Sequence, residues 1–230
     1  MGKEIGRSTE SDVDAFVAAL RAAPSKASAT RGRLVFALDA TASRDATWDR
    51  ASALHADMFQ EATIHGGLSV QLCHFHGFGE FHATPWLDEP KSLLRHMSET
   101  RCAAGVTQIE KLLRHVRVQC RGQPVGALVF VGDAFEESLD PVADAAGQLA
   151  LVGCPVFMFQ EGSDAQTARA FRTVARLSGG AWCRFDSASA AQLRELLRAV
   201  AAFVSGGRAA LQALEGRDGT LTRQLTHQLH

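Results

Sequence analysis

Residues 33–39, with the sequence RLVFALD, form a continuous apolar run that stops at an acid, and residues 127–133, ALVFVGD, repeat this pattern. Uninterrupted apolar runs of this length are typical of strands that are buried on both faces of a parallel sheet. The runs LSVQLCHF at 68–75, PVFMFQ at 155–160 and AWCRF at 181–185 have a similar character. We therefore predict a sheet whose strands are mostly parallel.

Segments with apolar residues at helical spacing alternate with these runs. They are residues 46–63, 90–100, 107–120, 138–151, 165–177 and 189–204. Strands that alternate with such helices indicate right-handed βαβ units, so the predicted architecture is a three-layer α/β/α sandwich. Residues 77–86 contain Pro85 near their end and favour a short edge strand, antiparallel to the strand at 68–75.

The chain divides into three parts in this interpretation. Residues 1–32 form an N-terminal amphipathic arm and linker, residues 33–205 form the α/β domain, and residues 206–230 form a C-terminal tail. The tail has no clear periodicity and is expected to be an appended strand or a docking segment. The roles of the arm and of the tail stay open at this point.

Composition excludes several classes of function. The formal net charge of the 230 residues is -1, which gives no global attraction to nucleic acid or to an anionic membrane. The five cysteines form no C-x-x-C pair, and the first residues contain no apolar signal core, so we expect a reduced, cytoplasmic location. The longest uncharged stretch, residues 145–160, is shorter than the roughly 20 apolar residues of a membrane-spanning helix.

Polar residues follow two of the predicted strands. Asp39 ends the first strand and opens the sequence DATAS, which contains Thr41 and Ser43, and Asp133 ends the strand at 127–132. Thr107 precedes a predicted helix, so its hydroxyl can point toward the same region. Ligands of open α/β sheets bind beyond the carboxyl ends of the strands, where the strand order reverses. If the two strands are neighbours, these side chains face one crevice.

This arrangement resembles the von Willebrand factor A (vWA) family, whose metal-ion-dependent adhesion site (MIDAS) is D-x-S-x-S, then a threonine, then an aspartate. The resemblance covers residues 33–204. This part of the chain is similar to the compact stand-alone vWA proteins of bacteria, which have a Rossmann-like fold. The sequence departs from the family pattern at Thr41, where the family usually has a serine, but the threonine keeps a hydroxyl at this position. The resemblance implies that the metal ligands are Asp39, Thr41, Ser43, Thr107 and Asp133.

The resemblance also implies that the chain binds a partner and does not catalyse a reaction. Mg²⁺ prefers six oxygen ligands, and this donor set would bind Mg²⁺, or Mn²⁺ or Ca²⁺, without filling its coordination shell. The open position would accept an Asp or Glu from a partner protein. The chain is thus expected to be a cytoplasmic adaptor and not an enzyme, with an ATPase-containing assembly as one candidate partner and with no nucleic acid or membrane as a ligand.

Two other functions remain open from the sequence. An aspartate at the end of the first strand is also found in Mg²⁺-dependent phosphohydrolases of the haloacid-dehalogenase type. Such enzymes place a second aspartate, as general acid, two positions later, whereas this chain has Thr41 there. The third hypothesis is a scaffold that binds partners without a metal, through its arm or its tail.

A zinc site at Cys73, His74, His76 and His82 is a further alternative. The period of two along a strand places Cys73 on the face opposite to His74 and His76. The ligand spacing of zinc fingers is also absent from the sequence. We therefore favour a structural or surface role for these residues.

Overall fold

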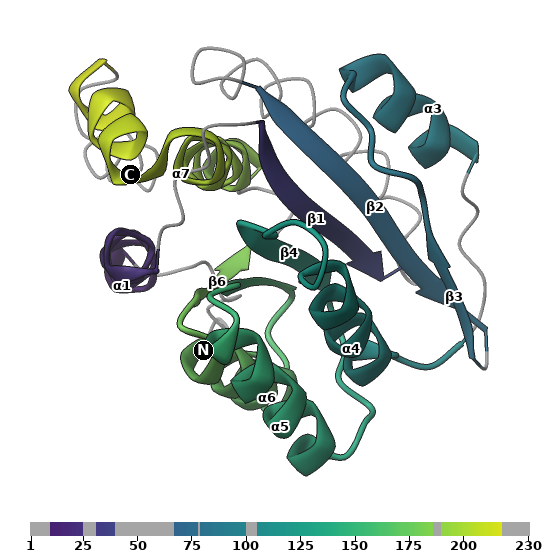
Figure 1. Ribbon diagram of the computed structural model, residues 1–230. Coiled ribbons are helices and arrows are strands. Elements are labelled where there is room, and N and C mark those ends of the chain that lie inside the picture. The colour runs from purple at the N-terminus through teal and green to yellow at the C-terminus, as the bar shows by residue number, and fades with distance from the viewer. Residues whose placement is uncertain are drawn as a thin grey trace.

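The computed structural model describes residues 10–24, 31–39, 67–77, 79–99, 105–185 and 190–217. This part of the chain forms a sheet with helices on both sides (Figure 1). The strands are β1 (Gly32–Asp39), β2 (Leu68–His76), β3 (Glu80–Ala83), β4 (Ala127–Gly132), β5 (Val156–Glu161) and β6 (Ala181–Phe185). The helices are α1 (Glu10–Ala22), α3 (Pro90–Glu99), α4 (Ile109–Gln119), α5 (Leu139–Leu151), α6 (Ala165–Ser178) and α7 (Ala190–Arg217).

The strand order in the sheet is β3-β2-β1-β4-β5-β6. All neighbouring strands are parallel except β3, which is antiparallel to β2. The chain builds the sheet outward from β1 in one direction and from β4 in the other, so the strand order reverses between these two strands. The predicted α/β sandwich with one antiparallel edge strand is confirmed.

The two faces of the sheet carry separate hydrophobic clusters. Along β1, Leu34, Phe36 and Leu38 belong to one cluster, and Val35 and Ala37 belong to the other. Residues of α1, α3 and α7 complete the first cluster, and residues of α4, α5 and α6 complete the second. Figure 1 shows α3 and α7 on one side of the sheet and α4, α5 and α6 on the other. Burial on both faces explains why this strand is apolar throughout.

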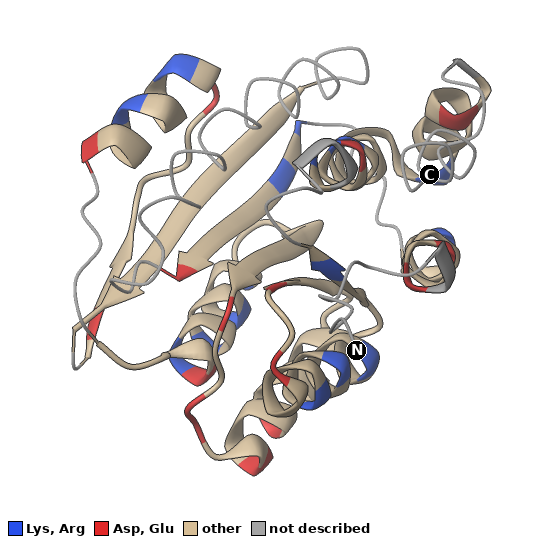
Figure 2. Cartoon of the chain, turned by 180° about the vertical axis from the view of Figure 1, so that it is seen from behind, with Lys and Arg blue, Asp and Glu red and all other residues tan. Residues whose placement is uncertain are grey.

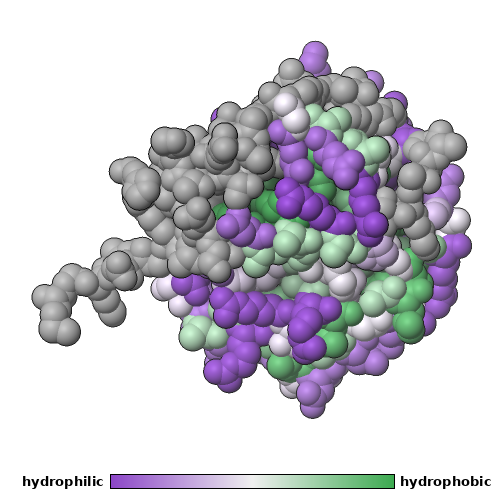
Figure 3. All heavy atoms as spheres, turned by 90° about the vertical axis from the view of Figure 1, so that its left-hand side faces the viewer, coloured by the Kyte–Doolittle hydropathy of each residue, from purple (hydrophilic) through white to green (hydrophobic). Residues whose placement is uncertain are grey.

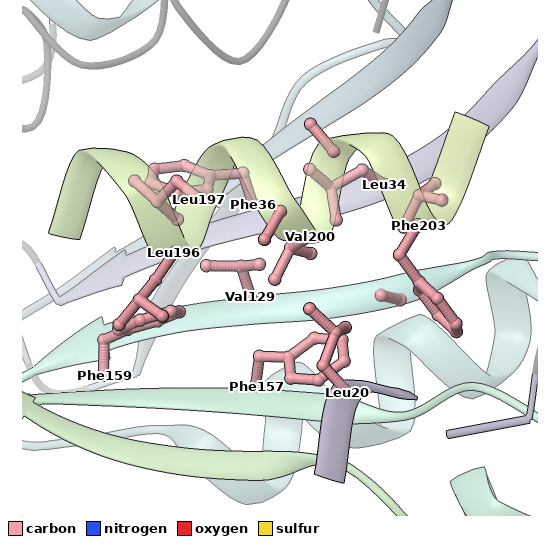
Figure 4. Packing of buried hydrophobic residues seen from close by; sticks show 14 of the residues in the cluster. Leu20, Leu34, Phe36, Val129, Phe157, Phe159, Leu196, Leu197, Val200 and Phe203 are labelled. Atoms are coloured by element: carbon pink, nitrogen blue, oxygen red, sulfur yellow. The ribbon is translucent and has the colours of Figure 1, made fainter. Parts of the chain in front are cut away.

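Helix α1 packs into the first cluster. The ring centroid of Phe16 lies 5.6 Å from that of Phe157 and 5.2 Å from that of Phe159 in β5. Figure 4 shows Leu20 of α1 beside Phe157, and the ring of Phe203 in α7 is edge-on to Phe157 at 6.4 Å. The helix within the predicted N-terminal arm therefore shares its core with the sheet.

Helix α7 extends beyond the predicted helix at 189–204. It reaches Arg217 after a kink at Gly207, whose φ is 67° and ψ is -157°. Leu211 and Leu214, which follow the kink, are buried in the first cluster. Residues before position 33 and after position 205 thus belong to the same hydrophobic cluster as the sheet. The domain boundaries at 32/33 and 205/206 stay predictions from the sequence. The predicted helix at 46–63 and residues 218–230 lie outside the described residues.

The surface of the described residues is mixed in character. Figure 3 views the side that carries α1 and the last part of α7, where hydrophilic side chains lie among smaller hydrophobic patches. Among the described residues, the large hydrophobic side chains that stay exposed are Val106, Val118 and Leu151. They come from different segments, as is normal for a protein surface. None of the described helices has both the length and the apolar character that crossing a bilayer requires.

Candidate metal centre at the carboxyl edge of the sheet

Strands β1 and β4 end side by side, where the strand order reverses. Their parallel register pairs Leu38 with Val131, so Asp39, the last residue of β1, and Asp133, the first residue after β4, both follow this pair closely. Asp39 is 0% exposed, and Asp133 is partly buried. The two acids that the sequence predicts as metal ligands therefore share one edge of the sheet. This is the edge at which open α/β sheets bind ligands.

Thr107 comes to the same edge on the segment before α4. This segment crosses the end of β2 closely, because Gly105 forms a parallel bridge with Gly77 and Val106 N donates to Gly77 O at 3.1 Å. A Cβ at position 105 would lie 2.2 Å from the backbone nitrogen of Gly77, so only glycine allows the approach. Thr107 itself is 3% exposed.

Hydrogen bonds join the loop after β4 to the start of α4. Glu136 N donates to Thr107 Oγ1 at 3.0 Å, and Thr107 N donates to Glu136 Oε2 at 3.2 Å. The carboxylate of Glu137 accepts from the first two backbone amides of α4, at 2.5 and 2.9 Å. A carboxylate in this position satisfies the amides that a helix leaves unpaired and interacts favourably with the helix dipole. The loop that carries Asp133 is thus fixed to the segment that carries Thr107.

Neither Glu136 nor Glu137 is among the site residues that the sequence predicts. The available signal is a pair of acids directly before the predicted helix at 138–151, which favours a role in the first turn of that helix. Glu137 instead caps α4, whose first residue precedes it by 28 positions. Sequence spacing alone gives no indication of this pairing, because it depends on the packing of two loops.

Hard oxygen donors gather at this edge as a result. Oδ2 of Asp39 and Oδ1 of Asp133 are shielded from solvent. Figure 2 shows acidic residues at the tip of a central strand and along a loop beside it. Carboxylate and hydroxyl oxygens fit a divalent cation such as Mg²⁺. Thr41 and Ser43, the other two predicted ligands, lie outside the described residues.

The hairpin of β2 and β3 carries a group of histidines near this edge. His74 pairs with His82 in the register of the two strands, and their ring centroids are 5.0 Å apart. The ring of His76 lies 5.3 Å from that of His82. Burial, with a smaller effect of His82 and His76, lowers the pKa of His74 to about 4. The imidazole of His74 is therefore neutral at pH 7.

Cys73 does not belong to this group of side chains. It lies in the second hydrophobic cluster, on the face that the period of two assigns to it. Burial raises the pKa of its thiol to about 12. Cys73 thus faces the apolar core, and its thiol does not join the histidines on the other face of the hairpin.

Comparisons with known proteins identify the fold. No protein-family model matches the chain, and no curated protein matches it in sequence. Among solved structures, the VWA domain of SpRpn10 is similar over 77% of this chain and 98% of its own length, with a TM-score of 0.56 and 8% identity. The chain has a vWA-like fold. The fold that the sequence resemblance implies is therefore confirmed.

Two further structural neighbours are much longer than this chain. The pilus adhesin SpaC from Lactobacillus rhamnosus GG, in its open conformation, has a TM-score of 0.60 and 11% identity, with coverage of 78% of this chain and 31% of SpaC. Proximal thread matrix protein 1 from the mussel byssus, with a zinc-occupied MIDAS motif, has a TM-score of 0.52 and 14% identity. That match covers 78% of this chain and 46% of the mussel protein. The chain thus spans less than half the length of each, and the likeness concerns the vWA fold alone.

Proposed function

We propose that this chain is a metal-dependent protein-interaction module, which binds a carboxylate of a partner protein through a divalent cation in a MIDAS. The observation that carries this proposal is the common position of Asp39 and Asp133, at the carboxyl ends of the adjacent strands β1 and β4, where the strand order reverses. Thr107 supports it, because its hydroxyl is held at the same edge by the loop after Asp133.

Asp39, Thr107 and Asp133 would hold the cation, with Thr41 and Ser43 as the further hydroxyl ligands that the family resemblance implies. A threonine oxygen has two lone pairs. The Thr107 oxygen uses one to accept from Glu136 N, which leaves the second for a cation. The bound ion, Mg²⁺ in our proposal and Mn²⁺ or Ca²⁺ as alternatives, would supply an open coordination position for an Asp or Glu of the partner.

The proposed partner is another protein, with a component of an ATPase-containing assembly as a candidate. A net charge of -1 supports neither nucleic acid nor an anionic membrane as the ligand. The chain would act in the cytoplasm as an adaptor, without turnover of a substrate.

Titration calorimetry with Mg²⁺ and with Mn²⁺ tests the metal site directly. We expect binding by the wild type and at least about ten-fold weaker binding by Asp39→Asn and Asp133→Asn, because each loses a charged oxygen ligand. Asp144→Asn is the matched control, since Asp144 is an exposed acid on α5 whose carboxylate accepts a hydrogen bond from Gln148, one turn along the same helix. Equal affinities for the wild type and Asp39→Asn would contradict the proposal.

The role in partner binding needs a separate experiment. The tagged chain and its Thr107→Val variant are used to capture partners in Mg²⁺ and in EDTA. We expect at least one protein to be retained only by the wild type and only with Mg²⁺. Retention that is insensitive both to EDTA and to Thr107→Val would favour a metal-independent scaffold. Asp39-dependent hydrolysis of phosphate esters with Mg²⁺ would favour the phosphohydrolase.

A further inference from the structure

The β2–β3 hairpin places His76, Glu80 and His82 on one face of the sheet. His76 pairs with Glu80 across the two antiparallel strands, and His82 lies two residues further along β3. Residues two apart share a face of a strand, so the three side chains project together. Each offers one atom that can bind a metal, and these atoms lie within 4.8 Å of one another. His76 Nδ1 is 2.9 Å from a carboxylate oxygen of Glu80.

We propose that His76, Glu80 and His82 form a second metal site, which binds a transition metal ion such as Zn²⁺. Imidazole nitrogen and carboxylate oxygen are common zinc ligands, with bonds of about 2.0 to 2.2 Å. Tetrahedral coordination with such bonds brings the ligand atoms to about 3.4 Å from one another. Rotation of the Glu80 side chain, which is 62% exposed, and of the exposed His82 closes the remaining distance. Three protein ligands leave the fourth position to water.

The backbone of this site is fixed by the start of α4. Gln108 Nε2 donates to His76 O and to Glu80 O, both at 3.3 Å, so one buried side chain joins the two ends of the hairpin turn. Lys111 Nζ donates to Gly79 O at 2.8 Å, within the turn itself. These contacts hold the ligand positions in place before a metal binds, which lowers the conformational entropy lost on binding.

The hairpin site is distinct from the candidate MIDAS. Asp39 pairs with Phe75 in the register of β1 and β2, and Phe75 belongs to the second hydrophobic cluster. His74 and His76, on either side of Phe75, project toward the other face. The nitrogen ligands of the hairpin site also favour ions such as Zn²⁺, whereas the oxygen ligands of the candidate MIDAS favour Mg²⁺, Mn²⁺ or Ca²⁺. The proposal therefore does not depend on the function proposed above.

The test is titration of the metal-free full chain with Zn²⁺, followed by calorimetry, and with Co²⁺, followed by its visible absorption. We expect His76→Ala and His82→Ala each to lower the Zn²⁺ affinity by about 10- to 100-fold or more, and Glu80→Gln to lower it as well. His96→Ala is the matched control, because His96 also lies beside a glutamate, Glu99, at 4.0 Å on α3. This variant should bind as the wild type does.

Asp39→Asn separates the hairpin site from the MIDAS. It should retain the high-affinity Zn²⁺ site and the Co²⁺ absorption. Zn²⁺ binding that is unchanged in the double variant His76→Ala/His82→Ala would overturn the proposal, and so would Zn²⁺ binding that is lost only in Asp39→Asn. Glu80→Gln controls for a loss of Zn²⁺ binding that is caused by unfolding, because the exposed side chain of Glu80 can be replaced without disturbing the core.

Discussion

Thr107 and Glu136 exchange two hydrogen bonds, one in each direction, although 29 positions separate them in the sequence. Thr107 thereby has a structural role in addition to its proposed role as a metal ligand. The loop after β4 and the segment before α4 are each irregular, and this pair fixes one against the other. Replacement of Thr107 is therefore expected to affect both the folding stability and the metal affinity.

Thr107→Val keeps the shape of the side chain but removes the hydroxyl. The amide of Glu136 then loses its acceptor, so the free energy of unfolding should fall by about 1 kcal/mol. Thr107→Ser keeps the oxygen and should lose less. Urea denaturation in EDTA measures the difference between the two variants without any contribution from a metal. A loss in Thr107→Ser that exceeds the loss in Thr107→Val would show that the methyl group contributes more than the hydrogen bond.

Most of the fold could be predicted from local pattern. Strand β1 is buried on both faces and is therefore apolar throughout, which makes it visible in the sequence. The last part of α7 could not be predicted, because the local sequence indicates that the helix ends. Gly206 and Gly207 resemble a helix stop, yet the chain turns at Gly207 and continues as a helix. The buried apolar residues after Gly207 are Ala210, Leu211 and Leu214, too few to show a helical periodicity by themselves.

The candidate site was predictable only in part. Asp39 and Asp133 are found because each ends an apolar run, so position along the chain indicates position at the sheet edge. Glu136 contacts Thr107 through a long-range pairing that no spacing rule describes. The same limit applies to the hairpin, where Glu80 comes beside His76 only through the register of β3 against β2.

Leu214→Ala tests whether the segment after the kink contributes to the core. Leu214 is completely buried, so its truncation should lower the free energy of unfolding by about 2 to 4 kcal/mol through lost contacts and a cavity. Leu151→Ala is the control, since Leu151 is 87% exposed and its truncation should cost less than about 0.5 kcal/mol. Chemical denaturation followed by circular dichroism provides both values. A loss at Leu214 no larger than at Leu151 would mean that this segment is detached in solution.

Gly207→Ala tests the kink itself. The φ of 67° and ψ of -157° at Gly207 are a combination that side chains rarely allow, so alanine should destabilise the fold by about 1 to 3 kcal/mol. Gly147→Ala, within α5, is the contrasting variant. A Cβ at position 147 would meet nothing within 4 Å, so alanine there should stabilise the helix by about 0.5 to 1 kcal/mol. Thermal melts of the two variants should move in opposite directions, and a stabilising Gly207→Ala would contradict the kink.

Asp164 provides a prediction about pH, because it caps α6. Its Oδ1 accepts from Thr167 N at 2.6 Å, and this bond to the backbone is the main cause that lowers the pKa of Asp164 from its ordinary value of 3.8. A carboxylate whose pKa is lowered by folding contributes its full stabilisation of the folded state at pH values above its pKa in the unfolded chain. This stabilisation is lost as the pH falls through the lower, folded pKa.

Asp164→Ala should therefore be less stable than the wild type by about 1 kcal/mol at pH 7, and the difference should narrow as the pH falls below about 4. Asp164 is exposed, so solvent screens its charge and the hydrogen bond is the larger part of the effect. Asp164→Asn retains an oxygen acceptor that does not titrate, so it should keep most of the stability at pH 7. Urea denaturation of the three proteins at pH 7, 5 and 3 measures these differences. A gap between the wild type and Asp164→Ala that stays constant down to pH 3 would show that the ionised carboxylate is not what caps α6.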